Sequence, residues 1–229
     1  MEINKKYPNI FEWDVENWSK AIYFWESNSS LLFPGNKALE VGAHNGGLSL
    51  WLGIKGINVV CSDMYFPTDK ARKKHKNYGV SDLVRYEKVD ALQMPYENEF
   101  EIIIFKSVLG GIGRDNNSNN ITVALENIHK ALKPGGELLF VENLKGSPLH
   151  QFFRKKFVKW GGSWNYQSID SLLSSTKKFS SMKYQTKGFL GAFGPDEKTR
   201  KFFGKIDTFV FDRITPQNWR YIFIGVAKK

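Results

Sequence analysis

The sequence predicts an α/β fold in which helices cover both faces of a mostly parallel sheet. Three observations predict it: short apolar runs recur along the chain, glycine turns follow several of them, and segments of helical periodicity intervene. The 229 residues, of which 41% are hydrophobic, suffice for one domain with a substantial core.

The first unit of this fold covers residues 37–63 and consists of a strand, a glycine turn, a helix and a second strand. Lys37–Val41 is a short apolar run, and a pair of glycines opens the helix predicted for Leu48–Lys55. Asn58–Cys61 is a β-branched run that Asp63 closes. Glycines let a backbone approach a ligand, and a helix N-terminus favours anions. A carboxylate at the end of the next strand accepts hydrogen bonds from ribose hydroxyls. The unit therefore predicts a nucleotide site.

The ligand is not predicted to be a dinucleotide, because the glycines fall at Gly42, Gly46 and Gly47 and the G-x-G-x-x-G fingerprint is absent. An acid, Glu40, stands two residues before the first glycine, and Asp63 follows the next strand. This order resembles motifs I and II of class I S-adenosylmethionine-dependent methyltransferases. The middle glycine of the family's pattern falls on His44, which would either crowd the turn or lie over the cofactor.

Later segments extend the resemblance to residues 37–143. Val84–Val89 precedes an Asp90-Ala91 pair, and Phe100–Phe105 is a nearly pure apolar run, as in a central parallel strand. Apolar residues then recur at helical spacing from Ile121 to Leu132. The run A-L-K-P-G-G-E-L-L-F-V-E that follows is similar to the family's segment before and through strand five.

The resemblance implies a Rossmann-like methyltransferase sheet with an antiparallel last strand, and S-adenosyl-L-methionine as cofactor. In the family the glycine turn lies beside the methionine part, the strand-two acid binds the ribose, and the acid–small pair contacts adenine. Carried over by motif, the cofactor-binding residues are Glu40, Gly42, Ala43, His44, Gly46, Asp63, Met64, Asp90, Ala91 and Lys106. The motif L-E-V-G-A-H-N-G-G-L-S-L-W is also similar to methyltransferases found with bacterial surface-polysaccharide biosynthesis genes.

Composition narrows the class of protein further. No apolar run approaches the ~20 residues that cross a bilayer, and the N-terminus lacks the apolar core of a signal peptide. The single cysteine, Cys61, excludes an internal disulfide and argues against a cysteine-based metal cluster. We therefore expect a cytoplasmic protein without a bound metal.

The positive charge is concentrated in the C-terminal part of the chain. Residues 1–144 hold 16 Lys/Arg against 18 Asp/Glu, whereas residues 145–229 hold 17 against 5. In the resembling family this second part builds the acceptor side. The charge thus indicates an anionic partner, such as a phosphorylated sugar, nucleic acid or an anionic membrane surface, or else a solvated basic surface.

We expect a single domain over residues 1–229. Residues 1–36, with a helix over Asp14–Ser27, would form an N-terminal helical cap, residues 37–143 the cofactor-binding half and residues 144–229 the acceptor-side half. In this last part Pro148–Trp160 reads as a basic aromatic helix. It would be either the crossover helix between strands five and six or a helix lying on a membrane surface. Residues 191–218 are long for a connection and would form an insertion beside the acceptor.

The segment after strand four excludes several kinds of methyl acceptor. Lys106–Gly111 lacks the Asp/Asn-Pro-Pro-aromatic sequence of DNA and protein-glutamine amino methylases, and Lys106 stands where certain ribose 2′-O-methylases need Asp. Cytosine-C5 methylation needs a nucleophilic Cys after strand four or five, but Cys61 belongs to strand two. What remains is mainly O-methylation of a sugar, glycan or other small molecule, or N-methylation of a small amine.

The loops that leave strands four and five are expected to face the methyl group. His150 is the first candidate for a general base, since its ordinary pKa of about 6.5 suits proton removal near neutral pH; the alternative is a polar residue at a helix start. Glu142 is the second candidate, as base or as partner of the acceptor hydroxyl. The charged helix face around His75 is interpreted as solvated. Rival functions are an RNA methyltransferase and a noncatalytic nucleotide- or nucleic-acid-binding protein.

Overall fold

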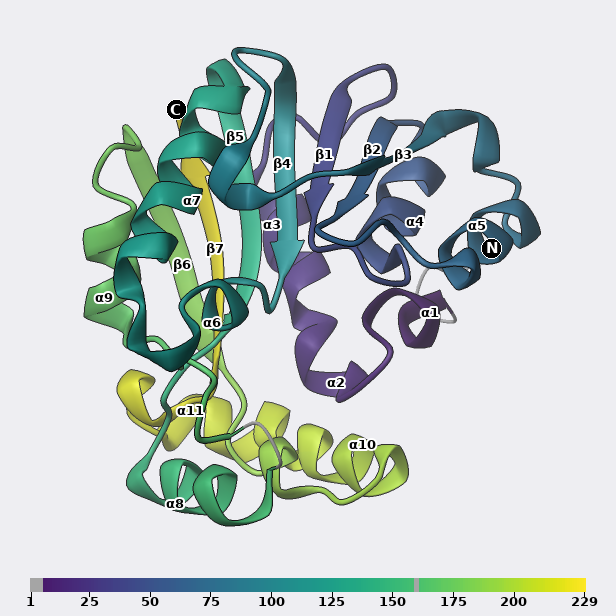
Figure 1. Cartoon of the computed structure of the whole chain (residues 1–229). Coiled ribbons are helices and arrows are strands. Elements are labelled where there is room, and N and C mark those ends of the chain that lie inside the picture. Colours follow the sequence, from purple (N-terminus) through teal and green to yellow (C-terminus); the bar gives the residue numbers. More distant parts are fainter. Residues whose placement is uncertain (1–5, 159–160) are drawn as a thin grey trace.

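A seven-stranded sheet forms the centre of the computed structural model, which describes residues 6–158 and 161–229 (Figure 1). Its order is β3-β2-β1-β4-β5-β7-β6. The strands from β1 to β5 pair in parallel, whereas β7 pairs antiparallel with both β5 and β6. The predicted sheet is therefore confirmed. The bounds are β1 Lys37–Val41, β2 Asn58–Asp63, β3 Val84–Lys88, β4 Phe100–Lys106, β5 Leu132–Asn143, β6 Ser181–Lys187 and β7 Ile222–Lys228.

Strand β4 shows that the sheet is buried on both faces. Successive side chains of a strand point to opposite faces. Ile102 and Ile104 accordingly belong to one apolar cluster, and Ile103 and Phe105 to the other. All four are 0% exposed, which explains the uninterrupted apolar run in the sequence.

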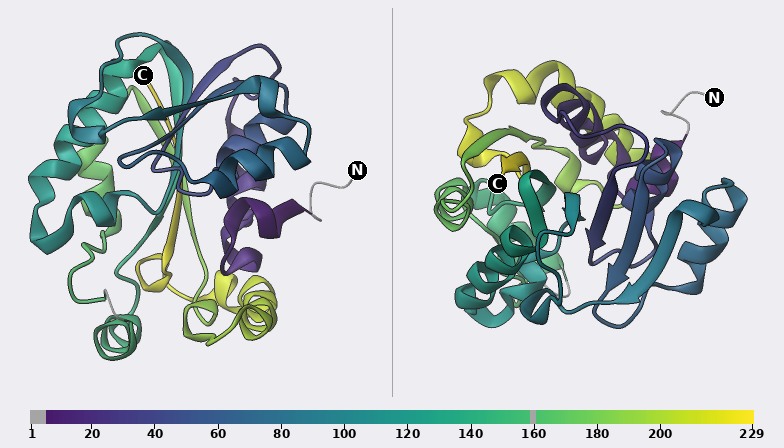
Figure 2. Two further views of the ribbon diagram at one scale, coloured as in Figure 1. Left: turned by 45° about the vertical axis from the view of Figure 1, so that its right-hand side comes forward. Right: turned by 90° about the horizontal axis from the view of Figure 1, so that it is seen from above.

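Helices cover the two faces, as predicted (Figures 1 and 2). α3 (Lys20–Asn28) and α4 (Gly47–Ile54) lie on one face, where the rings of Trp25 and Trp51 are 5.5 Å apart. α7 (Ser118–Ala131) and α9 (Ile169–Ser175) lie on the other and contribute the apolar residues Ile121, Leu125, Ile128 and Leu172. α5 (Asp69–Asn77) packs beside α4.

A further layer of helices lies beyond the carboxyl ends of the strands, at the bottom of Figure 1. It consists of α8 (Pro148–Phe157), α10 (Glu197–Ile206), the π-helix η6 (Asp207–Phe211) and α11 (Asp212–Ile214), with α2 (Val15–Trp18) above α10. α8 is not the crossover helix that packs on the sheet: α9 takes that place, because its Leu172 joins the core under α7. Lys159 and Trp160, included in the predicted helix, lie outside the described residues.

The remaining elements are short. The predicted single helix over Asp14–Ser27 is divided at Ser19 into α2 and α3. The others are α1 Tyr7–Phe11, α6 Leu109–Ile112, η2 Ser81–Leu83, η3 Ala91–Gln93, η4 Arg114–Asn116, η5 Gly191–Phe193 and η7 Gln217–Trp219. None of the helices in the described part of the chain is both long and apolar enough to cross a membrane.

Candidate functional site

Three loops meet at the carboxyl edge of the sheet. They follow β1, β2 and β4, and these strands are direct neighbours because β1 pairs with both of the others. The glycine loop after β1, Asp63 at the end of β2 and Ser107 after β4 thus come together from distant parts of the sequence. This is where an open parallel sheet binds its ligand.

The glycine loop is so close to the β4 loop that a side chain at Gly42 has no room. Gly42 has φ of 65°, and a Cβ built there would lie 2.7 Å from Cγ2 of Val108. Gly46, at the start of α4, has φ of 64°. Both positions need glycine for its left-handed backbone and for space, since a Cβ at Gly46 would lie 2.6 Å from Cε1 of His75.

His44 stands at the middle glycine of the motif and has a left-handed backbone, with φ of 46°. Its N–H donates to Oδ2 of Asp63 at 2.9 Å, and its carbonyl accepts from the N–H of Thr68 at 3.0 Å. These two bonds hold a conformation that costs a non-glycine residue roughly 1–3 kcal/mol. The side chain is exposed, so it does not crowd the turn.

His75 supports the glycine loop, and the interpretation as part of a solvated helix face is wrong. It is 0% exposed, with Nε2 2.8 Å from the Gly46 carbonyl and Nδ1 2.6 Å from the Tyr86 hydroxyl. Burial lowers the pKa of His75, which favours the neutral ring that can donate to one partner and accept from the other. The overlooked signal was the i, i+4 spacing of Ala71 and His75, the two buried residues of α5.

Glu40 ties β1 to the N-terminus of α4. Its carboxylate accepts from the N–H of Ser49 at 2.7 Å, from the N–H of Leu48 at 3.2 Å and from the Ser49 hydroxyl. It is only 4% exposed, and burial raises its pKa to about 7 although these hydrogen bonds oppose the shift. Glu40 therefore orients the loop between strand and helix.

Asp63, Met64 and Asp90 lie at the ends of β2 and β3. Beside the Asp63 carboxylate, Met64 is 48% and Tyr65 80% exposed, so apolar surface is available next to a hydrogen-bond acceptor. Asp90 caps η3 by accepting from the N–H of Leu92 at 2.8 Å, and Ala91 is buried. A carboxylate flanked by apolar surface suits a ribose joined to an aromatic base.

Lys106 ends β4, and its ammonium donates to the Phe11 carbonyl of α1. Burial lowers its pKa to about 8, while Glu12 and Glu40 act in the opposite direction. The α1 segment also covers the start of α4, since a Cβ on Gly47 would lie 2.0 Å from the Ile10 carbonyl oxygen. Lys106 thus fastens the N-terminal segment over the glycine loop.

Glu142 organises the loop after β4. It is 0% exposed, and its carboxylate accepts from the N–H groups of Val108 at 2.9 Å, Leu109 at 2.7 Å and Asn143 at 2.9 Å. Burial raises its pKa to about 7, against the effect of these donors. With its oxygens committed to the backbone, Glu142 is a positioning residue rather than a group that faces an acceptor.

Ser107 holds a left-handed backbone, with φ of 55°, in that same loop. Its N–H donates to the Val141 carbonyl at 2.8 Å, and its hydroxyl accepts from the Asn143 amide at 2.6 Å. Such strained non-glycine positions cluster at functional sites. Ser107 and Asn143 are therefore the polar side chains that the structure brings to the ends of β4 and β5.

The structure contradicts the prediction that His150 is a general base. His150 is 1% exposed; its Nδ1 accepts from the Ser147 N–H at 3.2 Å in a capping box at the start of α8, and its Nε2 lies 2.8 Å from the Phe189 carbonyl. Burial lowers its pKa to about 4. The alternative interpretation, a polar residue at a helix start, is the one that the structure supports.

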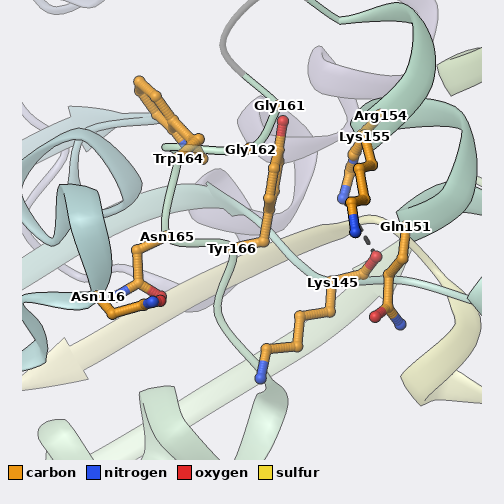
Figure 3. Close-up of a pocket in the computed structure, with 10 residues that line it drawn as sticks. All are labelled: Asn116, Lys145, Gln151, Arg154, Lys155, Gly161, Gly162, Trp164, Asn165 and Tyr166. Atoms are coloured by element: carbon orange, nitrogen blue, oxygen red, sulfur yellow. Dashed lines mark hydrogen bonds between the residues drawn. The ribbon is translucent and has the colours of Figure 1, made fainter.

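Two adjoining cavities lie beside the ends of β4 and β5. The first has a volume of about 390 Å³; in Figure 3 the amides of Asn116 and Asn165 lie on one side of it and Gln151, Arg154 and Lys155 on the other. The second, of about 560 Å³, shares two of its lining residues with the first. Both volumes suit a small organic ligand. The shared residues are Lys145 and Gln151.

Aromatic rings and a fixed cation complete the first cavity. The Arg154 guanidinium donates to the carbonyls of Leu144 at 2.6 Å and Lys145 at 3.1 Å and stacks 4.1 Å from the ring of Tyr166. Trp164 packs on the β4 loop, since a Cβ on Gly110 would lie 1.9 Å from its indole nitrogen. The cavity therefore borders the loop that Glu142 organises.

No metal centre is evident in the part of the chain that the structure describes. Within residues 6–158 and 161–229, His, Cys, Asp and Glu side chains form no group of three or more that could hold a metal ion. The candidate site therefore consists of the three loops and the two cavities.

Comparison with known proteins covers the three loops but little of the two cavities. Residues 39–140 match a family model described as a methyltransferase domain. Over 143 residues the chain is 32% identical to the ubiquinone/menaquinone biosynthesis C-methyltransferase UbiE of Shewanella sp. (strain W3-18-1), covering 58% of this chain and 53% of that relative. The chain spans about half or less of the length of the curated relatives it matches.

Solved structures share the fold at low sequence identity. The phosphoethanolamine N-methyltransferase 2 of Haemonchus contortus, in complex with S-adenosyl-L-methionine, has a TM-score of 0.66 and 16% identity, covering 99% of this chain and 56% of that one. The [4+2]-cyclase SpnF has a TM-score of 0.62 and 17% identity, covering 94% and 80%. Because proteins named for different reactions share this fold, the fold alone does not identify the acceptor.

Proposed function

We propose that this chain is an S-adenosylmethionine-dependent methyltransferase and that it methylates an oxygen of a small anionic sugar or glycan. The match of residues 39–140 to a methyltransferase domain, and the relatives and solved structures named above, support the enzyme class and the cofactor predicted from the sequence. The relatives named above do not support the narrower resemblance to surface-polysaccharide methyltransferases. The sugar acceptor is therefore argued from the site itself.

The residues at the carboxyl edge fit the cofactor. When bound, S-adenosylmethionine supplies a methyl group already activated on a sulfonium. We assign the glycine loop from Gly42 to Gly46 to its methionine part, Asp63 to its ribose, and Met64 with the Asp90-Ala91 pair to its adenine. The absence of space for a Cβ at Gly42, the half-exposed Met64 and the carboxylate of Asp63 support this assignment.

The single observation that carries the acceptor class is the chemistry of the two cavities. Amide groups, aromatic rings and lysines line them, with the acid Asp170 in the second cavity. The amides hydrogen-bond hydroxyls, the rings stack on sugar faces and the lysines attract negative charge. The amides and aromatic rings are those of Asn116, Gln151, Asn165, Gln167, Gln217, Asn218, Trp164, Tyr166 and Tyr184. Lys145, in the segment that follows β5, lines both cavities.

Alignment is the chief contribution that these residues would make. Holding an oxygen nucleophile in line with an activated methyl group replaces a bimolecular encounter by a nearly unimolecular one. Glu142 fixes the loop from Ser107 to Leu109, and Asn143 holds the hydroxyl of Ser107. We therefore assign to these residues the positioning of the acceptor side, and no proton transfer to His150.

Lys145→Ala tests the proposal. We expect the wild-type protein to bind S-adenosylhomocysteine and not NAD in a calorimetric titration, and to methylate sugar phosphates or uronic acids in preference to neutral sugars. Lys145→Ala should raise KM for the anionic acceptor by about tenfold, since a lost charged hydrogen bond is worth about 1.5–3 kcal/mol. Its affinity for S-adenosylhomocysteine should not change.

Lys183→Ala is the matched control, because Lys183 is an exposed lysine of β6 that lines neither cavity. Equal KM values for the two variants, or equal use of neutral and anionic sugars, would contradict the anionic acceptor. Methylation at carbon is the second candidate, because the UbiE relative is named a C-methyltransferase. Its product would be stable to reagents that cleave methyl ethers.

A further inference from the structure

The helices beyond the carboxyl edge expose an unusual amount of apolar surface. Fifteen large apolar side chains are exposed among the described residues, and eight of them belong to α8 or to the segment from α10 to η7. Exposed apolar patches of this kind mark interaction sites. The eight residues, which we call the apolar face, are Leu149, Phe152, Phe157, Phe202, Phe209, Val210, Ile214 and Trp219.

The apolar face is interleaved mainly with positive charge, and the exposed acid next to it is Asp196, the N-cap of α10. Within α8 and the segment from α10 to η7, every exposed charged side chain is a lysine or arginine. The acidic residues of these segments, Glu197, Asp207 and Asp212, are buried or half-buried. The exposed cations are Lys155, Lys156, Lys198, Lys201, Lys205 and Arg213.

In α8 and α10 the side that packs against the rest of the protein is opposite to the side that carries the exposed rings. In α8 the buried residues are His150 and Arg154, while Phe152 is 61% exposed. In α10 the buried residue is Gly204, where a Cβ would lie 2.7 Å from the side chain of Glu16, while Phe202 is 62% exposed. Phe152 and Phe202 are two residues from their buried neighbours, which places them on the far side of each helix.

A buried hydrogen-bond network holds η6, the part of the layer that carries Phe209 and Val210. Asp207 accepts from the N–H groups of Leu190 at 2.7 Å and Gly191 at 2.9 Å. The Asn17 amide donates to Asp207 and to the Tyr221 hydroxyl, each at 2.8 Å. This buried network joins η6 to α2 and to the residue before β7.

We propose that the apolar face docks on the surface of an anionic lipid bilayer. Phenylalanine and tryptophan side chains interleaved with lysine and arginine on a helix surface are the composition of interfacial membrane binding, in which the rings enter the headgroup region and the cations attract anionic lipid. Charge complementarity favours the anionic bilayer over a second copy of the chain, because two copies would bring like charges together. In Figure 1 and in the left-hand view of Figure 2, α8 and α10 both lie at the lower end of the molecule, so one flat surface can meet both.

Vesicle sedimentation tests the proposal with the full chain. We expect the protein to sediment with vesicles of phosphatidylglycerol and phosphatidylcholine in equal parts, and much less with phosphatidylcholine alone. Binding should fall as salt rises, since the lysines attract the anionic headgroups electrostatically. The double variant Phe152→Ser/Phe209→Ser should lower the partition coefficient by about tenfold or more, because burying each ring is a substantial part of such binding.

Phe33→Ser is the matched control, since Phe33 is 50% exposed in the loop before β1, at the opposite edge of the sheet. It should bind vesicles as the wild type does, and all variants should keep the wild-type melting temperature and affinity for S-adenosylhomocysteine. Equal binding to neutral vesicles, equal loss in Phe33→Ser, or no sedimentation at all would overturn the proposal. So would a dimer in the absence of lipid that the double variant abolishes, or salt-sensitive binding of single-stranded RNA without binding of vesicles.

Discussion

Replacing Gly42 by alanine adds one methyl group where the glycine loop comes closest to the β4 loop. The new Cβ would lie 2.7 Å from Cγ2 of Val108, on a backbone with φ of 65°. A left-handed backbone costs a non-glycine residue roughly 1–2 kcal/mol. Crowding adds about 1–3 kcal/mol, because the branched Val108 has few other rotamers.

Gly79→Ala separates the two contributions. Gly79 has nearly the same backbone, with φ of 67°, but a Cβ there meets no atom within 4 Å. We expect chemical denaturation to show a loss of roughly 1–2 kcal/mol in the free energy of unfolding for Gly79→Ala and of roughly 2–5 kcal/mol for Gly42→Ala. In calorimetry only Gly42→Ala should weaken the binding of S-adenosylhomocysteine, by about tenfold or more.

Two results would refute this reasoning. Equal losses of stability in Gly42→Ala and Gly79→Ala would mean that Val108 moves aside without cost. Unchanged affinity for S-adenosylhomocysteine in Gly42→Ala would mean that the glycine loop does not hold the cofactor, and the assignment of the whole carboxyl edge would fail with it.

Two other substitutions test separate parts of the site, and a third, at Asp14, the buried residue before α2, tests the pH dependence of stability. His75→Phe leaves the Gly46 carbonyl unpaired, so we expect denaturation to show a loss of about 1–3 kcal/mol and calorimetry to show weaker S-adenosylhomocysteine binding; a loss of stability alone would confine His75 to the scaffold. Asp63→Ala should weaken the binding of S-adenosylhomocysteine by about tenfold or more, since charged hydrogen bonds contribute about 1.5–3 kcal/mol. Unchanged affinity in this variant would mean that Asp63 does not bind the ribose. Asp14→Asn tests pH dependence: burial, with Glu197 and Asp207 adding to it, raises the pKa of Asp14 to about 8. The folded protein then binds this proton more tightly than the unfolded chain, whose ordinary value is about 3.9. Wild-type stability should therefore fall as the pH rises from about 4 to about 8, by about 1.4 kcal/mol per unit at most, and denaturation of the neutral Asn variant should show a flatter profile; parallel profiles would contradict a buried, protonated Asp14.

The sequence predicted the sheet well because its signals are local. The apolar run of β4, the glycines around α4 and the acids at the ends of β1 and β2 each lie within a few residues of the element they define. Their order along the chain was sufficient to indicate the family and the cofactor, since a parallel sheet brings the carboxyl ends of its strands to one edge.

Predictions about single side chains failed where burial decided the outcome. His150 was assigned from its ordinary pKa, but burial lowers that pKa to about 4, against the effect of its hydrogen bond to the Phe189 carbonyl, 39 residues away. His75 lies in a run of lysines, yet its ring reaches Gly46, 29 residues away. Ionisable groups change their pKa with desolvation, and desolvation depends on segments that the local pattern does not describe.

The sequence by itself determined the class of fold, the cofactor motifs and the excess of positive charge after residue 144, because these depend on composition and on neighbours along the chain. The tertiary structure alone decided that Glu142 holds the β4 loop, that α9 rather than α8 covers the sheet, and that α8 and α10 both lie beyond the carboxyl ends of the strands. Such facts depend on which segments pack together, and packing is a property of the whole chain, since each buried group must find its partner among residues far away in sequence.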